Sequence, residues 1–224
     1  MPQTERRIRL FGGGTFIAAG ILLLAANLLL VFLPAPPTAP GDFLRWITAH
    51  KLCIALANEL LFFANLLLVP SFVVLGRLLA PWRNVSALAG LSIVALALPL
   101  LAMINVVEGR LVYPVYSLDL SGETLQLVFS TVYGGLHALS LMLGAAFLFL
   151  GFALRGTGFH KSMVPVSYVV GVLQIVGAYP WLTPVALNVS VSLSLPLWLA
   201  LAGILMLRTK PQEGTHETLN LSTR

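Results

Sequence analysis

The chain contains few charged residues for its length. Charged residues make up 9% of its 224 residues, whereas hydrophobic residues make up 58%. Soluble domains usually carry about 25% charged residues, because charged side chains cover the surface that faces water. A disordered chain is also excluded, since disorder requires low hydrophobicity. The composition therefore indicates a helical protein that crosses a membrane several times.

Cysteine and histidine are scarce as well. The single cysteine, Cys53, excludes an intrachain disulfide, a CxxC redox pair and a Cys-rich metal site. A metal centre needs three or four protein ligands, and only one histidine, His137, lies within an apolar segment. We therefore expect no metal and no cofactor. The basic residues lie between apolar segments instead of forming a cluster, so nucleic acid is not an expected partner.

Apolar segments long enough to cross a membrane recur along the chain. A helix needs roughly 20 apolar residues to cross about 30 Å of hydrocarbon, and the first apolar run is too long for a signal peptide. We predict an all-α bundle of six transmembrane helices in one domain, residues 1–210, followed by a polar, disordered tail, residues 211–224. The predicted spans are 11–33, 52–76, 85–107, 124–150, 164–181 and 190–207.

The basic residues predict the orientation of these spans. Of the 13 Lys and Arg residues, 10 fall on the side that contains both termini and 3 fall on the other side. Because cytoplasmic loops are rich in Lys and Arg, both termini are expected in the cytoplasm. An even number of spans also places both termini on one side, so the charge pattern and the span count agree.

The predicted outer loops contain two helix-start signals. Prolines within residues 34–40 predict a stiff, extended segment. Asp42 is a candidate N-cap for a short helix that would lay Phe43 and Ile47 on the membrane surface. Ser121 is a candidate N-cap for the fourth span.

Two ionisable residues lie inside the predicted spans, where such residues are costly and usually functional. Glu59 belongs to the second span and His137 to the fourth. At 1.5 Å per residue, Glu59 is expected roughly 12 Å below the outer surface and His137 roughly 20 Å below it. The two side chains are candidates for a catalytic acid–base pair.

The fourth span carries a polar stripe. Its polar residues are spaced by 4, 3, 4 and 3 positions, so they share one helix face that should point into the bundle. Other polar residues lie mostly in the outer halves of the spans, which predicts a cavity that opens outward and is closed on the cytoplasmic side. The candidate ligand-binding residues are Asn58, Asn65, Asn105, Gln126, Ser130, Tyr133, Gln174 and Tyr179.

Prolines at positions 70, 99 and 196 lie inside predicted spans. Proline lacks the N–H that would bond to the carbonyl four residues earlier. Pro196 therefore frees the carbonyl of Ser192. In a membrane such a carbonyl is expected to be satisfied by a neighbouring group or to line a cavity.

Four short motifs support a resemblance to known proteins. They are Arg6-Arg7-x-Arg9, Asn58-Glu59-Leu-Leu, Gly109-Arg110-Leu-Val-Tyr-Pro114 and Gly134-Gly135-Leu-His137-Ala. With these motifs the chain resembles a broad class of small bacterial membrane proteins with six helices. The resemblance implies the six-helix fold and the bacterial cytoplasmic membrane, and it implies no particular reaction.

The leading hypothesis is a membrane protein whose outward-facing polar pocket binds a small amphiphilic or lipid-like ligand. Three alternatives stay open. Glu59 and His137 would serve a membrane-embedded enzyme acting on a lipid-like substrate, and the same groups would serve a proton-coupled transporter. A non-catalytic subunit of a membrane complex is the third. Membrane lipids and the ligand are the expected partners, and a homo-oligomer is left open.

Overall fold

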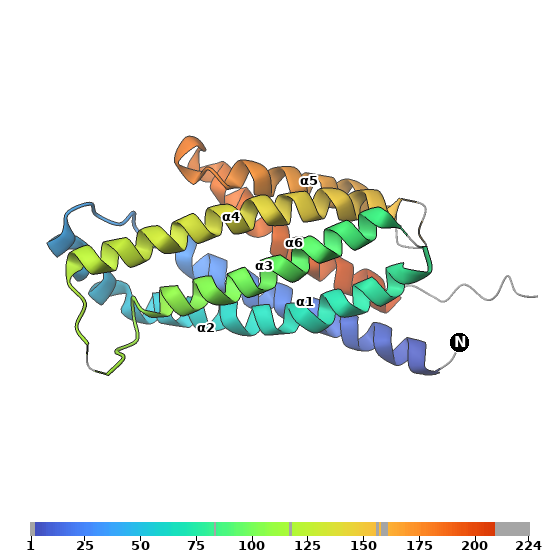
Figure 1. Ribbon diagram of the computed structural model, residues 1–224, viewed down its shortest axis with the longest axis horizontal. Coiled ribbons are helices and arrows are strands. Elements are labelled where there is room, and N and C mark those ends of the chain that lie inside the picture. The colour runs from blue at the N-terminus through green and yellow to red at the C-terminus, as the bar shows by residue number, and fades with distance from the viewer. Residues whose placement is uncertain (1–2, 83, 117, 156, 158–160, 209–224) are drawn as a thin grey trace, which may run out of the picture.

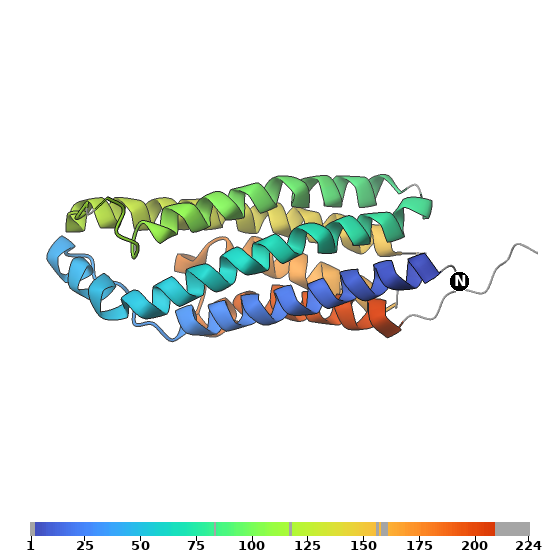
Figure 2. The ribbon, with the colours of Figure 1, turned by 90° about the horizontal axis from the view of Figure 1, so that it is seen from below.

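The computed structural model describes residues 3–82, 84–116, 118–155, 157 and 161–208. These residues fold into an all-helical bundle (Figures 1 and 2). The predicted tail, residues 211–224, lies outside the described residues. The helices are α1 (Gln3–Val31), α2 (Pro40–Leu79), α3 (Val85–Gly109), α4 (Gly122–Leu154), α5 (Met163–Gly177) and α6 (Val185–Arg208), with the 3-10 turns η1 (Ala80–Trp82) and η2 (Pro180–Leu182).

Five of these helices, α1, α2, α3, α4 and α6, are long and apolar enough to cross a membrane, which identifies a multi-pass membrane protein. Helix α5 is the exception. Its 15 residues span about 22 Å at 1.5 Å per residue, which is less than a full hydrocarbon core. The predicted span continued to Trp181, whereas the helix ends before Pro180. Proline disfavours helical backbone in the preceding residue, and Tyr179 has φ −118° and ψ 61°.

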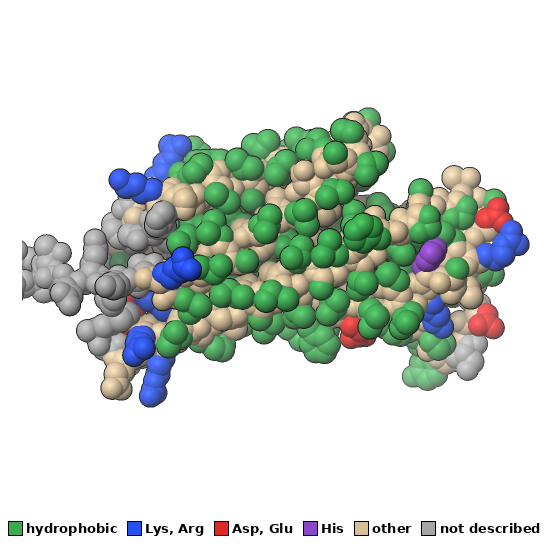
Figure 3. Space-filling model, turned by 180° about the vertical axis from the view of Figure 1, so that it is seen from behind, with side chains coloured by type: hydrophobic (Ala, Val, Ile, Leu, Met, Phe, Trp, Pro, Cys, Tyr) green, Lys and Arg blue, Asp and Glu red, His purple; other side chains and the backbone are tan. Residues whose placement is uncertain are grey.

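The six helices form a closed ring. Helix α1 packs against α2 and α6, and the ring continues through contacts of α2 with α3, α3 with α4, α4 with α5 and α5 with α6. The first residues of α1 and the last residues of α6 lie at the same end of the bundle (Figures 1 and 2). Lys and Arg side chains gather at that end, and a broad apolar surface separates them from the charges at the far end (Figure 3).

Helix α2 differs from the prediction at its start. The expected short surface helix is the beginning of α2, which runs unbroken for 40 residues, or about 60 Å. Its N-cap is Ala39, without a side-chain hydrogen bond, and Pro40 occupies the first turn, where a missing N–H costs nothing. Asp42 instead forms an ion pair with Arg45. The prediction of a separate helix capped by Asp42 is therefore wrong.

The first turns of α2 belong to an extension of the bundle beyond the turn between α5 and α6 (Figures 1 and 2). We define this extension as residues 40–51, the described residues 110–116 and 118–121 of the connection, and the first turns of α4. Phe43 and Ile47 are buried in it against Leu125 and neighbouring residues, so they do not lie on a membrane surface. Gln126 also belongs to the extension, because its Nε2 donates to the Thr38 carbonyl at 2.7 Å.

Side chains cap two of the bundle helices. The Oγ of Ser121 accepts a hydrogen bond from the Thr124 N–H at 3.3 Å, which confirms Ser121 as the N-cap of α4. Asn84 caps α3 in the same way, because its Oδ1 accepts from the Ser86 N–H at 2.9 Å. Both caps satisfy donors that the first turn of a helix leaves free.

The half of the bundle nearer the termini is filled by an aromatic layer, which we define as Phe16, Phe72, Phe147 and Trp198. The ring of Trp198 lies 4.7 Å from Phe147, 6.0 Å from Phe16 and 6.4 Å from Phe72, measured between centroids. The Trp198 Nε1 donates to the Oγ of Ser167 at 2.9 Å. Buried aromatic rings thus join α1, α2, α4 and α6 across the bundle.

Candidate functional site

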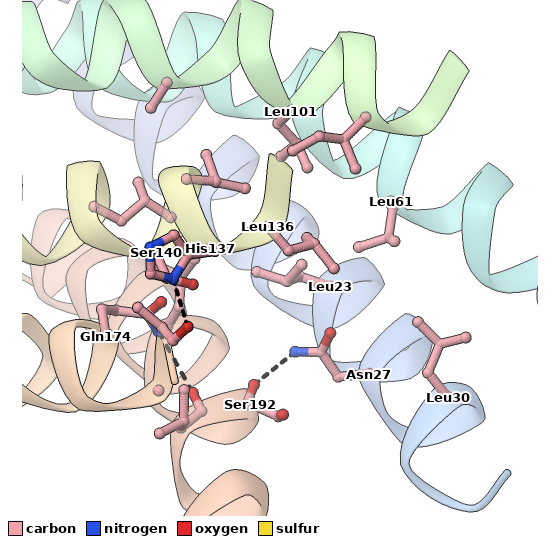
Figure 4. Close-up of a pocket in the computed structure, with 18 of the residues that line it drawn as sticks. Leu23, Asn27, Leu30, Leu61, Leu101, Leu136, His137, Ser140, Gln174 and Ser192 are labelled. Carbon is pink, nitrogen blue, oxygen red and sulfur yellow. Dashed lines mark hydrogen bonds between the residues drawn. The ribbon is translucent and has the colours of Figure 1, made fainter. Parts of the chain in front are cut away.

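A cavity of about 360 Å³ lies on the far side of the aromatic layer and is lined by all six helices (Figure 4). Its volume falls within the range of small-molecule sites, about 300–1,000 Å³. Apolar residues, ten of them leucine, make up most of the wall, and Phe72 of the aromatic layer contributes to the floor. The polar residues in the wall are Asn27, Asn105, Glu108, Tyr133, His137, Ser140, Gln174 and Ser192.

Asn27 links α1 to α6 at the edge of this cavity. Its Nδ2 donates to the Ser192 carbonyl at 2.6 Å (Figure 4). That carbonyl is the one freed by Pro196, so the expectation that a neighbour would satisfy it is confirmed. The contact fixes α6 against α1 where α6 lacks one of its own hydrogen bonds.

His137 lines the cavity and also supports the end of α5. Its Nδ1 lies 2.7 Å from the Ala178 carbonyl, and because a carbonyl can only accept, Nδ1 is the donor. The imidazole also packs edge-on against Tyr179, with ring centroids 5.0 Å apart. In the neutral ring, Nε2 is then left as an acceptor. The contact with Ala178 places His137 level with the end of α5. The turns of α4 that precede His137 extend beyond that level and belong to the extension.

Gln174 connects α5 to α6 on the same side of the cavity. It is buried, and its Nε2 donates to the Ser194 Oγ at 3.2 Å and to the Val191 carbonyl at 3.5 Å. Like Asn27, Gln174 uses its donor group to hold two helices together. These contacts leave less of the side chain to recognise a ligand.

Asn105 and Glu108 differ from the other polar residues in the wall. They lie three residues apart on α3, and they are 2% and 8% exposed. Neither polar atom of the Asn105 amide has a hydrogen-bond partner among the described residues. Within the same part of the chain the ion pairs are Arg9–Glu5 and Arg45–Asp42, so Glu108 has no cationic partner there. A buried polar group without a partner costs roughly 1–3 kcal/mol, and a charged group costs more.

Glu108 is a site residue that the sequence analysis missed. The predicted third span ended at Val107, which assigned Glu108 to an outer loop. In the structure α3 continues to Gly109 and carries Glu108 into the cavity wall. The spacing of Asn105 and Glu108 was the available signal, because residues three apart share a helix face.

Glu59 lies outside the cavity wall. Its side chain is exposed on the bundle surface, where Oε1 accepts a hydrogen bond from the Tyr113 hydroxyl at 2.7 Å. Burial, the bond to Glu59 and the Glu59 charge together raise the pKa of Tyr113 above its ordinary value. Asn58, the residue that precedes Glu59, is buried and also lies outside the wall. The structure does not bring Glu59 and His137 together around one cavity.

The remaining predicted residues divide between the cavity and the rest of the bundle. Tyr133 lines the cavity with His137 and Ser140, so this part of the polar stripe points inward. Ser130 lies outside the wall, and its hydroxyl donates to the Leu127 carbonyl of its own helix. Gln126 also lies outside the wall, in the extension. Asn65 donates to the Leu98 carbonyl at 3.1 Å, which ties α2 to α3. Tyr179 lies outside the wall and packs its ring against His137.

In the part of the chain that the structure describes, no three His, Cys, Asp or Glu side chains come together in a way that would hold a metal ion. A comparison of the chain with protein-family models, curated proteins and solved structures finds no match. Function is therefore inferred from the geometry of the cavity alone.

Proposed function

We propose that this multi-pass membrane protein binds a small amphiphilic or lipid-like molecule in the cavity between its helices. The observation that carries the proposal is the distribution of the wall residues. Leu68, Phe72 and Leu143 form its apolar end near the aromatic layer, whereas Asn105 and Glu108 lie toward the far end. Apolar walls with a few placed polar groups are typical of sites for such ligands.

The exposed wall residues support an opening at the polar end of the cavity. Tyr133 is 45% exposed, and Leu136 and Val31 are also exposed although they line the cavity. They lie on α4 and α1, beside the turn between α5 and α6. With both termini in the cytoplasm, as the basic residues predict, this opening faces the outer side of a bacterial cytoplasmic membrane.

Two other functions receive less support from the geometry. An enzyme that used Glu59 and His137 would need both groups at one substrate, but Glu59 lies on the bundle surface. A proton-coupled transporter would need a polar path to the other side, whereas the aromatic layer fills the bundle there. A subunit role without its own ligand has no particular observation in its favour.

The proposal can be tested with a photoactivatable ten-carbon alcohol that carries a diazirine on its chain. The purified protein in phosphatidylcholine nanodiscs would be irradiated with the probe, and the labelled peptides identified by mass spectrometry. We expect labelling of wall residues. Leu139→Trp should lower that labelling about tenfold, because Leu139 lines the cavity, is 7% exposed and would become a much larger side chain.

Leu127→Trp is the matched control, because it makes the same change on α4 at a residue that is 67% exposed and lies outside the wall. It should leave cavity labelling unchanged, with both variants checked for an unaltered melting temperature. Labelling restricted to the outer surface of the helices would overturn the proposal. So would equal cavity labelling of a folded Leu139→Trp variant and the wild type.

A further inference from the structure

The wall of the cavity is acidic. Among the described residues that line it, Glu108 is the one carboxyl group, and none is Lys or Arg. We propose that the cavity selects a cationic amphiphile, a molecule with one ammonium head and an apolar chain, and that Glu108 is its counter-ion. This inference rests on the proposed function above and specifies the ligand class of the same site.

The surroundings of Glu108 contain no positive charge paired with it among the described residues. The carboxyl is 8% exposed on the last turn of α3, and no side-chain hydrogen bond or ion pair to it is present among the described residues. Arg110 is the next cation along the chain. Its Nη1 is buried without a partner among the described residues, and no ion pair there joins it to Glu108. A carboxylate held away from water is stabilised when a cation pairs with it, because attraction is strong at low dielectric.

Asn105 supplies a second group suited to an ammonium head. Its Oδ1 is buried, lacks a partner among the described residues and lies one helical turn from Glu108. An ammonium group has three N–H donors and no acceptor, so a carboxylate and an amide oxygen on one helix face match two of them. The aromatic ring of Tyr133, also in the wall, adds a surface of the kind that attracts cations.

Other head groups fit this wall less well. A carboxylate or phosphate head would approach Glu108 with a like charge. A hydroxyl head would leave the charge of Glu108 without a counter-ion. The chain of the ligand would then occupy the leucine-lined space toward Phe72, which removes apolar surface from contact with water.

The test uses three probes with the same diazirine-bearing ten-carbon chain, ending in a primary amine, a hydroxyl or a carboxylate. The protein is again held in phosphatidylcholine nanodiscs, whose lipids carry no net charge. We expect Glu108→Gln, which keeps the size of the side chain, to lower cavity labelling by the amine probe about tenfold or more. Labelling by the hydroxyl probe should persist, which also reports that the variant is folded.

Glu59→Gln is the matched control, because it removes a carboxylate that lies outside the wall. It should change none of the three labelling levels. A further arm uses the wild-type protein alone. Unlabelled decylamine should displace the amine probe from the cavity at a concentration at least tenfold lower than decanol does, and this result does not depend on the folding of any variant.

The outcomes separate this inference from the proposed function. If the hydroxyl probe labels the cavity while decylamine competes no better than decanol, the cationic ligand is excluded and an amphiphile site remains. The same conclusion follows if Glu108→Gln reduces hydroxyl labelling rather than amine labelling, because Glu108 would then act as a neutral donor. If no probe labels the wall, both proposals fail.

Discussion

The two halves of the bundle differ in how their interior is filled: one is packed with aromatic rings and the other contains a cavity. In the half near the termini, the rings of Phe16, Phe147 and Trp198 are at most 1% exposed, and the Trp198 N–H is bonded to Ser167. In the other half the same helices enclose a cavity of about 360 Å³, and in its wall the side chains of Asn105 and Glu108 lack partners among the described residues. The first half holds the helices together by packing, whereas the second half encloses the space in which the proposed ligand would lie.

The difference also appears within the polar residues of the cavity half. Asn27 and Gln174 each donate to a carbonyl or hydroxyl of a neighbouring helix, and His137 donates to the Ala178 carbonyl at the end of α5. Among the described residues, the side chains of Asn105 and Glu108 make no such contact. Polar groups that stabilise a membrane bundle use up their hydrogen bonds within it, so the unpaired groups are the stronger candidates for recognition.

The largest expected effect concerns the aromatic layer. Trp198→Ala should lower the free energy of unfolding by about 3–5 kcal/mol, because it removes a fully buried ring from a packed region. Leu139→Ala, in the cavity wall, should cost about 2 kcal/mol, at the low end for its kind, since Leu139 already borders open space. Denaturant titration in detergent micelles measures both. If the two variants lost the same free energy of unfolding, the aromatic layer would be no more tightly packed than the cavity wall.

A smaller loss of stability is expected for a polar residue whose hydrogen bond joins two helices. Asn27→Ala should lower the free energy of unfolding by about 1–3 kcal/mol, because the Ser192 carbonyl freed by Pro196 loses its donor. The same titration applies. Ser190→Ala is a suitable control, because Ser190 is exposed and its hydroxyl donates to the Ala186 carbonyl of its own helix, without joining two helices.

The smallest effect has the opposite sign. Asn105→Leu should raise the free energy of unfolding by about 1 kcal/mol, because it replaces an unpartnered buried amide with an apolar side chain of similar size. The same variant should weaken labelling by the amine probe. A loss of stability would mean that Asn105 is satisfied in the membrane, and it would weaken the contrast between bonded and unpaired polar residues.

Much of the helical architecture was predictable because a membrane-spanning helix needs a run of about 20 apolar residues, which is visible in the sequence alone. Long apolar runs predicted the presence of α1, α3 and α6, although α1 and α6 begin earlier and α3 ends later than predicted, and the N-cap preference predicted the start of α4 at Ser121. Two other boundaries differ more strongly from the apolar runs. Helix α2 begins far earlier than its apolar core, and α5 ends early at Pro180, because tertiary packing and local backbone geometry decide these boundaries.

The candidate site was predicted only in part. His137, Tyr133, Asn105 and Gln174 were expected at a cavity and do line one. Glu59, the other ionisable candidate, satisfied the same sequence criterion and lies on the surface, bonded to Tyr113. The position of a residue within a span gives its depth in the membrane. It does not give the direction of its side chain, which faces either the cavity or the outer surface of the bundle.

The sequence by itself determined that this chain is a helical membrane protein with few charges inside its spans. That conclusion depends on composition and local periodicity, which need no knowledge of neighbours. Only the tertiary structure decided which polar groups are already paired. The pairing of Asn27 with Ser192 joins residues 165 positions apart, and the isolation of Glu108 depends on the side chains that six helices place around it.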